Sequence, residues 1–269
     1  MNVLKKVFDF YIYSNIHVAI AAFSLVKVTL LGITAENDIP LFVFFSTVFS
    51  YNLIRFFSNV GNELSFSKLF EYNKKSLLFL SLISFAGMLF ILFQHGLENI
   101  QLLLLMGVVT MLYGLPIDKH NSKLRNVKYV KIFLIAFVYA IITVVWPLQN
   151  YAIEIGSGKL VYTLQRFLFI LLLTLPFDIR DLVFDSNSLQ TLPQLLGVRK
   201  TKYFGLLLFL LISVLEFCKS VYDLPFVFIS FLALILLILS SDKQSKYYAS
   251  FWVEGIPILW LVLEMIYVK

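Results

Sequence analysis

The sequence is poor in cysteine and in charge. Cys218 is the single cysteine among 269 residues, which excludes an internal disulfide framework and any cysteine-rich metal site. The three histidines, His17, His95 and His120, are widely separated and do not suggest a histidine metal site. Charged residues make up only 14% of the chain, whereas soluble domains carry roughly a quarter. These shortages exclude an ordinary soluble domain and a disulfide-stapled one.

Hydrophobic residues dominate the composition. Hydrophobic residues make up 60% of the chain, and its mean hydropathy is +0.87. Because a transmembrane helix needs about 20 consecutive apolar residues, the sequence predicts an all-α, polytopic membrane bundle of about nine transmembrane helices in one domain, residues 1–269. The predicted spans are 17–34, 39–60, 76–94, 98–116, 129–148, 160–177, 203–218, 222–240 and 247–267.

The basic residues predict the orientation of this bundle. The net charge is +6, and most lysines and arginines fall in alternate connections, which places those connections and the N-terminus in the cytoplasm by the positive-inside rule. An odd number of spans then places the C-terminus outside. Membrane topology accounts for the basic charge, so we expect a lipid bilayer and no nucleic acid as partner. The longest polar inner connections are predicted near 61–75, 117–128 and 178–202, which favours a site facing inward.

Three aspartates at the inner end of the sixth span are the first candidate site residues. Asp178, Asp181 and Asp185 are spaced i, i+3 and i+7, so they share one face of a helix. Three carboxylates held together repel one another unless a cation neutralises them, and oxygen ligands suit Mg²⁺. The alternative is a solvated acidic face that pairs with Arg180 and Arg199.

Two further segments accompany the aspartates. The stretch 191–197 reads Thr-Leu-Pro-Gln-Leu-Leu-Gly and follows Asp185 at a short distance. The three aspartates and the stretch 191–197 together form a pattern that resembles the second aspartate-rich motif of the UbiA superfamily of intramembrane prenyltransferases. The segment 112–116, Leu-Tyr-Gly-Leu-Pro, followed by Lys119, is similar to the family's tyrosine, proline and basic segment.

The resemblance implies a fold, an activity and a set of ligands. It implies nine helices, with both aspartate-rich motifs on the cytoplasmic side. It also implies an enzyme that transfers an isoprenoid, an alkyl group other than methyl, from a Mg²⁺-bound prenyl diphosphate to an aromatic or other lipid-soluble acceptor. The catalytic, metal-binding residues would be Asp178, Asp181 and Asp185, with one or two Mg²⁺ ions. Basic loop residues would bind the diphosphate, namely Lys119, Lys123 and Arg125.

The place of the family's first motif, at the inner end of the second span, differs in this chain. Asn52, Arg55 and Asn59 repeat the spacing of the three aspartates but carry no carboxylate. An amide offers Mg²⁺ one neutral oxygen, and an arginine repels the ion. Arg55 could instead donate two hydrogen bonds to the diphosphate, with Asn52 and Asn59 beside it, or it could pair with Asp181.

The substituted motif leaves other functions open. The main alternative is a noncatalytic UbiA-like membrane protein that binds a lipid or a partner and has lost the first metal motif. A small transporter is a third reading, which the gathering of polar residues at one membrane face disfavours. Three acids lie in or near late spans without a role that the sequence indicates: Glu216, Glu254 and Glu264.

Overall fold

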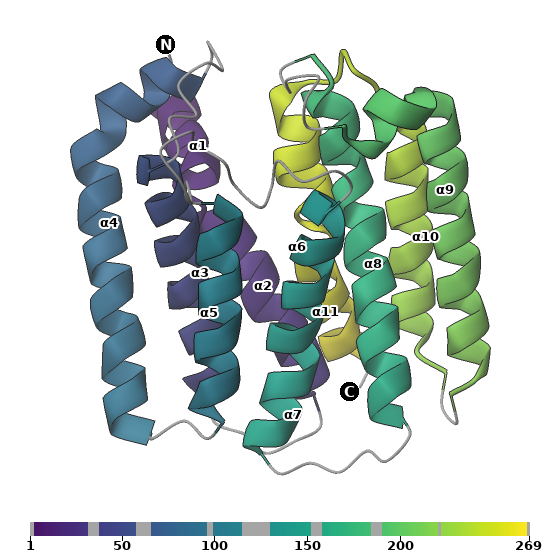
Figure 1. The fold of residues 1–269 in the computed structure, drawn as a ribbon, viewed down its shortest axis with the longest axis horizontal. Coiled ribbons are helices and arrows are strands. Elements are labelled where there is room, and N and C mark those ends of the chain that lie inside the picture. The colour runs from purple at the N-terminus through teal and green to yellow at the C-terminus, as the bar shows by residue number, and fades with distance from the viewer. Residues whose placement is uncertain are drawn as a thin grey trace.

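The described part of the chain is entirely helical. The computed structural model describes residues 3–31, 38–57, 66–95, 99–114, 130–151, 158–183, 190–219 and 222–267. Within these ranges there are helices and no β-strand, so the predicted all-α class is confirmed. Figure 1 shows the helices running side by side as a bundle.

Each predicted apolar segment overlaps one of the helices or a continuous run of them. The α-helices are α1 (Val3–Tyr13), α2 (Ile16–Thr29), α3 (Asp38–Phe57), α4 (Phe66–His95), α5 (Ile100–Gly114), α6 (Val130–Ala140), α7 (Trp146–Asn150), α8 (Gly158–Asp181), α9 (Leu192–Phe217), α10 (Leu224–Leu239) and α11 (Ile256–Tyr267). Two π-helical turns, η2 (Ile141–Val145) and η4 (Tyr248–Val253), continue into α7 and lead toward α11.

Helix length and composition make this a multi-pass membrane protein. Among the described residues, 5 helices are long and apolar enough to cross a membrane, or 6 if the bent pair α1 and α2 counts as one span. The five are Asp38–Phe56, Lys74–Gln94, Lys131–Asn150, Gly158–Asp181 and Tyr248–Tyr267. The helices α5 and α10 are shorter but also apolar.

The bundle has two distinct ends. Figure 1 shows that α3, α5 and α8 end, and that α4, α6 and α9 begin, at the end where α1 lies. We call this the near end and the opposite one the far end. The chain terminus after α11 lies toward the far end (Figure 1). The described helices that flank the predicted polar connections therefore begin or end at the near end. The side of the membrane that this end faces is still a prediction.

Two of the predicted polar connections are shorter than expected. Helix α4 begins at Phe66, so the later part of 61–75 is helical, and the connection 178–202 contains the end of α8 and the first turns of α9. Helix α9 starts early because Pro193 fits a first helical turn and the Thr191 N–H donates to Gln194 Oε1 at 3.0 Å, half of a capping box. The connection 117–128 lies outside the described residues.

The first span is broken. The helices α1 and α2 are bent by 53° at Ser14 and Asn15. Asn15 has a φ of 63°, in the left-handed region that asparagine tolerates better than most residues. A break inside a membrane domain leaves backbone carbonyls without helical partners, so other side chains must satisfy them.

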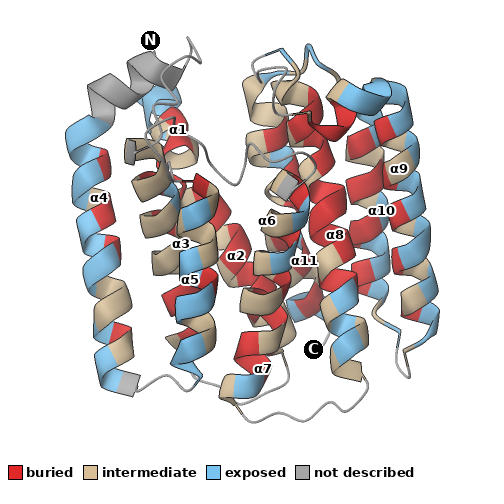
Figure 2. Cartoon of the chain, in the orientation of Figure 1, coloured by how far each residue is buried: buried red, intermediate tan, exposed pale blue. Residues whose placement is uncertain are grey.

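The core lies along α8. Figure 2 shows buried residues concentrated on α8 and α2, with exposed residues along the outer helix α4. Phe169 of α8 packs against Phe226 and Trp260, with both ring centroids at 5.5 Å. Phe93 of α4 is 86% exposed, as expected of a side chain that faces lipid. The polar groups of α8 are therefore held by the most enclosed helix of the bundle.

Candidate functional site

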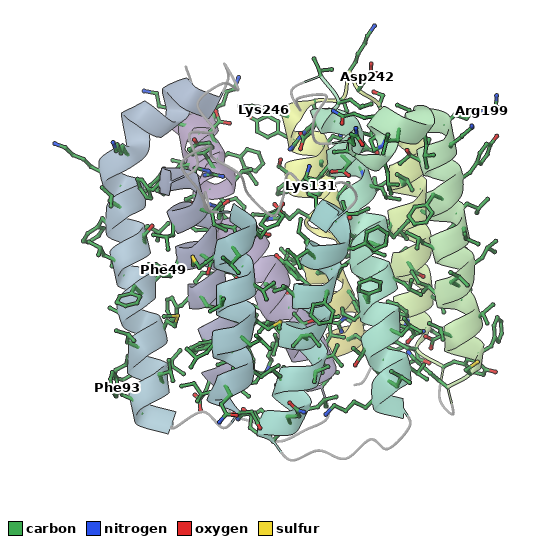
Figure 3. The ribbon with its side chains drawn as sticks, viewed as in Figure 1. Phe49, Phe93, Lys131, Arg199, Asp242 and Lys246 are labelled. Atoms are coloured by element: carbon green, nitrogen blue, oxygen red, sulfur yellow. The ribbon has the colours of Figure 1, made fainter. Side chains whose placement is uncertain are left out.

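The two described aspartates of the predicted motif lie at the near end of α8, each beside a cation. Asp178 is 2% exposed, and its Oδ1 is 2.9 Å from the Nζ of Lys131, at the start of α6. Figure 3 shows Lys131 inside the near half of the bundle. Asp181 Oδ1 accepts a hydrogen bond from Arg180 Nε at 2.7 Å. Asp178 is therefore not a solvated surface acid, whereas Asp181 is half-buried and forms the pair with Arg180 that the alternative interpretation of the sequence predicted.

Arg180 joins the motif to the last helical segment. Its Nη1 donates to Ser250 Oγ of η4 at 2.8 Å, and its guanidinium lies over the ring of Phe177 at 5.3 Å from the centroid. Arg180 thereby holds α8 against η4 while it neutralises Asp181.

Of the three carboxylates in the Mg²⁺ prediction the structure describes two, so Mg²⁺ binding stays a prediction. Among the described residues no group of three or more acidic, histidine or cysteine side chains is arranged to hold a metal. Asp185, the third predicted ligand, lies outside these residues. Mg²⁺ commonly takes one or two carboxylates, with substrate phosphates and water as its other ligands. Asp178 and Asp181 could supply that share, provided that Lys131 and Arg180 give up their places to the ion.

On α3, Asn52 forms hydrogen bonds with the residues at the break between α1 and α2. Asn52 is 1% exposed. Its Oδ1 accepts from Asn15 Nδ2 at 2.7 Å, and its Nδ2 donates to the Ser14 carbonyl at 3.2 Å. The amide thus satisfies a carbonyl that the bend frees and holds Asn15 in its left-handed conformation.

Arg55 acts at the same break. It donates to the Tyr13 carbonyl and, at 3.1 Å, to Asn15 Oδ1, and its guanidinium lies 4.2 Å from the centroid of the Tyr13 ring. The ion pair with Asp181 that the sequence left open is not formed, because Asp181 pairs with Arg180. The polar face of α3 therefore has a structural role that the sequence did not indicate.

The remaining predicted site residues cannot be placed. Asn59, Lys119, Lys123, Arg125 and Asp185 all lie outside the described residues. Their roles in binding diphosphate or metal stay predictions.

Glu254 is the acid that the sequence left without a role and that the structure places at the site. It follows the π-helical turn η4, and its N–H donates to the Ala249 carbonyl at 3.1 Å. Arg180 of α8 donates to Ser250 Oγ in this turn at 2.8 Å, which brings the turn that precedes Glu254 against the near end of α8. The sequence signal was an acid followed by Gly255 and Pro257 inside an apolar segment, a pattern of an interrupted helix in a membrane.

Two tyrosines share this region. The hydroxyls of Tyr51 on α3 and Tyr139 on α6 are 3.3 Å apart. Tyr51 keeps 37% of its surface exposed although its hydroxyl meets the facing helix.

His17 connects α2 to the same π-helical turn. Its Nε2 lies 3.0 Å from the carbonyl oxygen of Phe251, which can only accept, so Nε2 carries the proton. Its Nδ1 then accepts from the Tyr11 hydroxyl at 2.7 Å. The imidazole is neutral in this arrangement and fixes the turn that carries Glu254.

Asp9 connects α1 to the segment before η4. Asp9 Oδ1 accepts hydrogen bonds from Lys246 Nζ at 2.9 Å and from the Tyr247 hydroxyl at 2.6 Å. Burial lowers the pKa of Lys246, but its hydrogen bonds to Asp9 and Tyr247 outweigh burial and raise that pKa above its ordinary value. Lys246 therefore stays charged and holds α1 against the segment before η4 at the near end (Figure 3).

A second group of charged residues lies at the far end. Glu216 Oε2 accepts from Gln165 Nε2 at 2.9 Å and pairs with Lys219 Nζ at 2.7 Å, and Glu216 Oε1 accepts from the Asp223 N–H at 2.7 Å. Glu264 Oε1 accepts a hydrogen bond from Trp260 Nε1 at 2.9 Å, and the charge of Glu264 acts to raise the pKa of Asp223. We call Gln165, Glu216, Lys219, Asp223 and Glu264 the far-end cluster.

Arg166 lies on α8 between the two ends. Its guanidinium donates to the Leu25 carbonyl at 2.9 Å and to the hydroxyls of Thr143 at 3.1 Å and Thr29 at 3.2 Å. It also lies over the Trp260 ring, 4.9 Å from the centroid. Carbonyl, hydroxyl and ring together satisfy this buried cation, which holds α8 to α2 and to η2.

The fold and the site define a multi-pass helical membrane protein with a group of charged and phenolic side chains at its near end. Comparison of the chain with known proteins finds no matching family model, no matching curated protein and no matching solved structure. The resemblance to intramembrane prenyltransferases therefore rests on the motif residues themselves.

Proposed function

We propose that the protein is a UbiA-like membrane prenyltransferase, which transfers an isoprenoid from a Mg²⁺-bound prenyl diphosphate to an aromatic or other lipid-soluble acceptor. The observation that carries the proposal is the burial of the Asp178 carboxylate, 2% exposed, at the near end of α8, with Asp181 on the next helical turn. A solvated acidic face would have left Asp178 in water.

Asp178 and Asp181 would hold the ion, and the cations beside them would bind the substrate's diphosphate. Bound Mg²⁺ would supply the positive charge that stabilises the departing diphosphate. Lys131 and Arg180 already lie within hydrogen-bond distance of the carboxylates, so they need to move little to reach phosphate oxygens. Lys119, Lys123 and Arg125 would extend this basic surface.

The polar side chains of α3 favour the binding of one Mg²⁺ ion rather than two. Asn52 and Arg55 hold the break between α1 and α2, so they offer no carboxylate for a second Mg²⁺. The fixed charge of Arg55 would replace part of the second ion's attraction for diphosphate.

The proposal includes the finer topology. Nine crossings follow if the pair α1 and α2, the shorter helices α5 and α10, and the charged helix α9 all cross the bilayer. The near end would then face the cytoplasm and the C-terminus the outside, as the basic residues predict.

A noncatalytic lipid- or partner-binding protein is the second candidate. The observation in its favour is the structural use of Asn52 and Arg55, which leaves the first motif without a role in metal binding.

A transferase assay with purified protein separates the two. We expect Mg²⁺-dependent release of diphosphate with at least one pair from a panel of prenyl diphosphates and acceptors. Asp181→Asn should lower this turnover by about 100-fold or more and leave folding nearly unchanged. Asp242→Asn is the matched control, because Asp242 is an exposed near-end acid (Figure 3). Wild-type turnover in the Asp181 variant would refute the proposal, and lipid binding without turnover for any pair would favour the second candidate.

A further inference from the structure

The near end of α9 carries two cations that no carboxylate neutralises within the described residues. Arg199 is exposed and Lys202 is half-buried, and because they lie three residues apart they share one face of the helix. Their printed contacts are with a hydroxyl, a ring and a carbonyl, and include no acid. Figure 3 shows Arg199 at the outer edge of the bundle, away from Lys131. These cations are therefore separate from the candidate site.

Hydrogen bonds hold both cations in place. Arg199 Nε donates to the Tyr203 hydroxyl at 3.1 Å, and the guanidinium lies over the Tyr203 ring, 5.7 Å from its centroid. Lys202 Nζ donates to the Ile238 carbonyl at 2.7 Å, in the last turn of α10, where helical carbonyls lack partners. We call Arg199, Lys202 and Tyr203 the α9 basic surface. The positive-inside rule accounts for basic residues at this end, but it does not require that they be held in this way.

The donors that remain on the α9 basic surface suit a phosphate group. Arg199 uses only Nε in its hydrogen bond to Tyr203, so the N–H groups of both Nη atoms are left to bind a ligand. A guanidinium binds phosphate oxygens through two parallel hydrogen bonds. The ammonium of Lys202 also has N–H groups left, and the Tyr203 hydroxyl, which accepts from Arg199, can still donate its own proton. Three neighbouring side chains can thus donate to one anion.

An exposed apolar stripe continues from the α9 basic surface along the same face of the helix. Its residues follow Tyr203 at spacings i+3, i+4, i+7 and i+11, and they are 42–58% exposed: Leu206, Leu207, Leu210 and Val214. No charged residue occurs between Lys202 and Glu216. The stripe is about 12 Å long, which fits within the roughly 15 Å of one leaflet's hydrocarbon. Cations at one end of an apolar stripe match the headgroup and the acyl chain of an anionic lipid.

We propose that the α9 basic surface binds an anionic phospholipid, with the headgroup phosphate on Arg199, Lys202 and Tyr203 and an acyl chain along the apolar stripe. Basic residues between membrane helices bind anionic headgroups in this way. A zwitterionic headgroup would bring a cation of its own to the surface, so a headgroup of net negative charge is preferred. The inference rests on the crossing of the bilayer by α9, as proposed above, but not on prenyl transfer.

Lipid titration followed by native mass spectrometry of the purified protein tests this surface. The probes are phosphatidylglycerol and phosphatidylcholine with identical acyl chains. Because one basic residue near an anionic headgroup contributes a factor of about five, wild type should prefer phosphatidylglycerol by about 20-fold, and Arg199→Gln and Lys202→Gln should each remove about fivefold of that preference. The double variant should lose nearly all of it. Tyr203→Phe removes the hydroxyl that holds Arg199 and should cost about twofold.

The double variant Lys74→Gln with Lys75→Gln is the matched control. These exposed lysines lie at the start of the candidate span of α4, which is at the opposite edge of the bundle from α9 (Figure 1). The control removes the same amount of charge, so its lipid preference should stay within about twofold of wild type if the α9 basic surface is the site. In detergent without added lipid, the α9 variants should unfold within a few degrees of wild type, since substitutions at exposed positions change stability little.

Three results would overturn the inference: no preference in wild type, an equal loss of preference in the α4 control, or wild-type preference in the α9 double variant. Binding of water-soluble glycerol 3-phosphate as tight as that of phosphatidylglycerol would also overturn it, because the acyl chain would then contribute nothing. No prenyl diphosphate is present in these measurements. A lipid preference that fails while turnover is intact would refute only this inference, and a preference that persists in a protein without turnover would refute only the proposed transferase activity.

Discussion

The two ends of the bundle both enclose charged side chains, but they differ in what holds those charges. At the far end, Glu216 has the Gln165 amide, Lys219 and the Asp223 N–H as partners, all from its own neighbourhood on α8, α9 and the start of α10. At the near end, Asp178 lies beside a lysine that a metal ion could replace, and Glu254 lacks a donor among the described residues. A satisfied network stabilises the fold, whereas charges with replaceable partners can bind a ligand.

The largest effect is expected from breaking the far-end cluster. Glu216→Leu removes the partner of Lys219, whose side chain is 6% exposed, and leaves the Gln165 amide and the Asp223 N–H unsatisfied. The free energy of unfolding should fall by about 4 kcal/mol. Denaturation of the purified protein in detergent measures the loss, which Mg²⁺ should not repair.

A double variant provides the control for this loss. Adding Lys219→Met to Glu216→Leu removes the unpaired cation and should recover part of the stability. A loss below about 1 kcal/mol in Glu216→Leu, or a loss that Mg²⁺ reverses, would show that the far end is not a purely structural network.

The near end should respond to Mg²⁺ where the far end does not. Lys131→Met leaves the buried Asp178 without its lysine and should cost about 3 kcal/mol in the absence of Mg²⁺. If Asp178 binds the ion, Mg²⁺ should restore much of this loss and stabilise the variant more than the wild type. Thermal unfolding with and without Mg²⁺ measures the difference.

Arg199→Met is the matched control for the lysine variant. Arg199 is an exposed cation at the same end of the bundle (Figure 3), so its removal should change little with or without Mg²⁺. Equal stabilisation of Lys131→Met and wild type by Mg²⁺ would show that Asp178 is not a ligand of the ion.

Substitution of Arg55 tests whether the polar side chains of α3 stabilise the fold or bind the ligand. Arg55→Met removes the hydrogen bonds to the Tyr13 carbonyl and Asn15 and the contact with the Tyr13 ring, and should cost about 2 kcal/mol of stability. Arg55→Lys should recover little, because an ammonium does not reproduce the planar fork of donors. Unfolding experiments measure the cost. Unchanged stability combined with lost affinity for prenyl diphosphate would instead make Arg55 a substrate-binding residue.

Local sequence patterns predicted the parts of the site that depend on one helix. Apolar length predicted the helices, and the spacing of Asp178 and Asp181 predicted that both would lie on one face at the near end of α8. The arrangement of α1 and α2 was missed, because the break depends on Asn15 and on the distant side chains Asn52 and Arg55 that stabilise it.

The partners of the site residues could not be predicted, because they come from other helices. Nothing in the sequence links Lys131 to Asp178, or Arg180 to Ser250, since these pairs meet only when α6, α8 and η4 pack together. The extent of the polar connections was overestimated for a related reason. Charged residues in the first turns of α9 resembled a loop, whereas Pro193 and the Thr191 cap start the helix there.

The smallest expected effect is a pH response confined to the far end. Burial, together with the negative charge of Glu264, raises the pKa of Asp223 from 3.8 to about 7, although the Phe226 N–H and Lys219 act to lower it. A carboxyl group whose pKa is higher in the folded protein than in the unfolded one stabilises the fold below pH 4, and this contribution is lost as the pH rises through 7. Because Asp223 is partly exposed and water screens its charge, the loss between mildly acidic and mildly basic pH should be about 1 kcal/mol.

Asp223→Asn should remove much of that pH dependence. Asparagine can still accept the hydrogen bond from the Phe226 N–H, 2.7 Å in the wild type, and remains neutral at every pH. The thermal midpoint of the variant should therefore fall less than that of the wild type as the pH is raised, and Mg²⁺ should not alter either slope. If the variant kept the wild-type slope, the proton would lie elsewhere in the cluster. A slope that Mg²⁺ changed would mean that the far end also binds cations, and the contrast between the two ends would no longer hold.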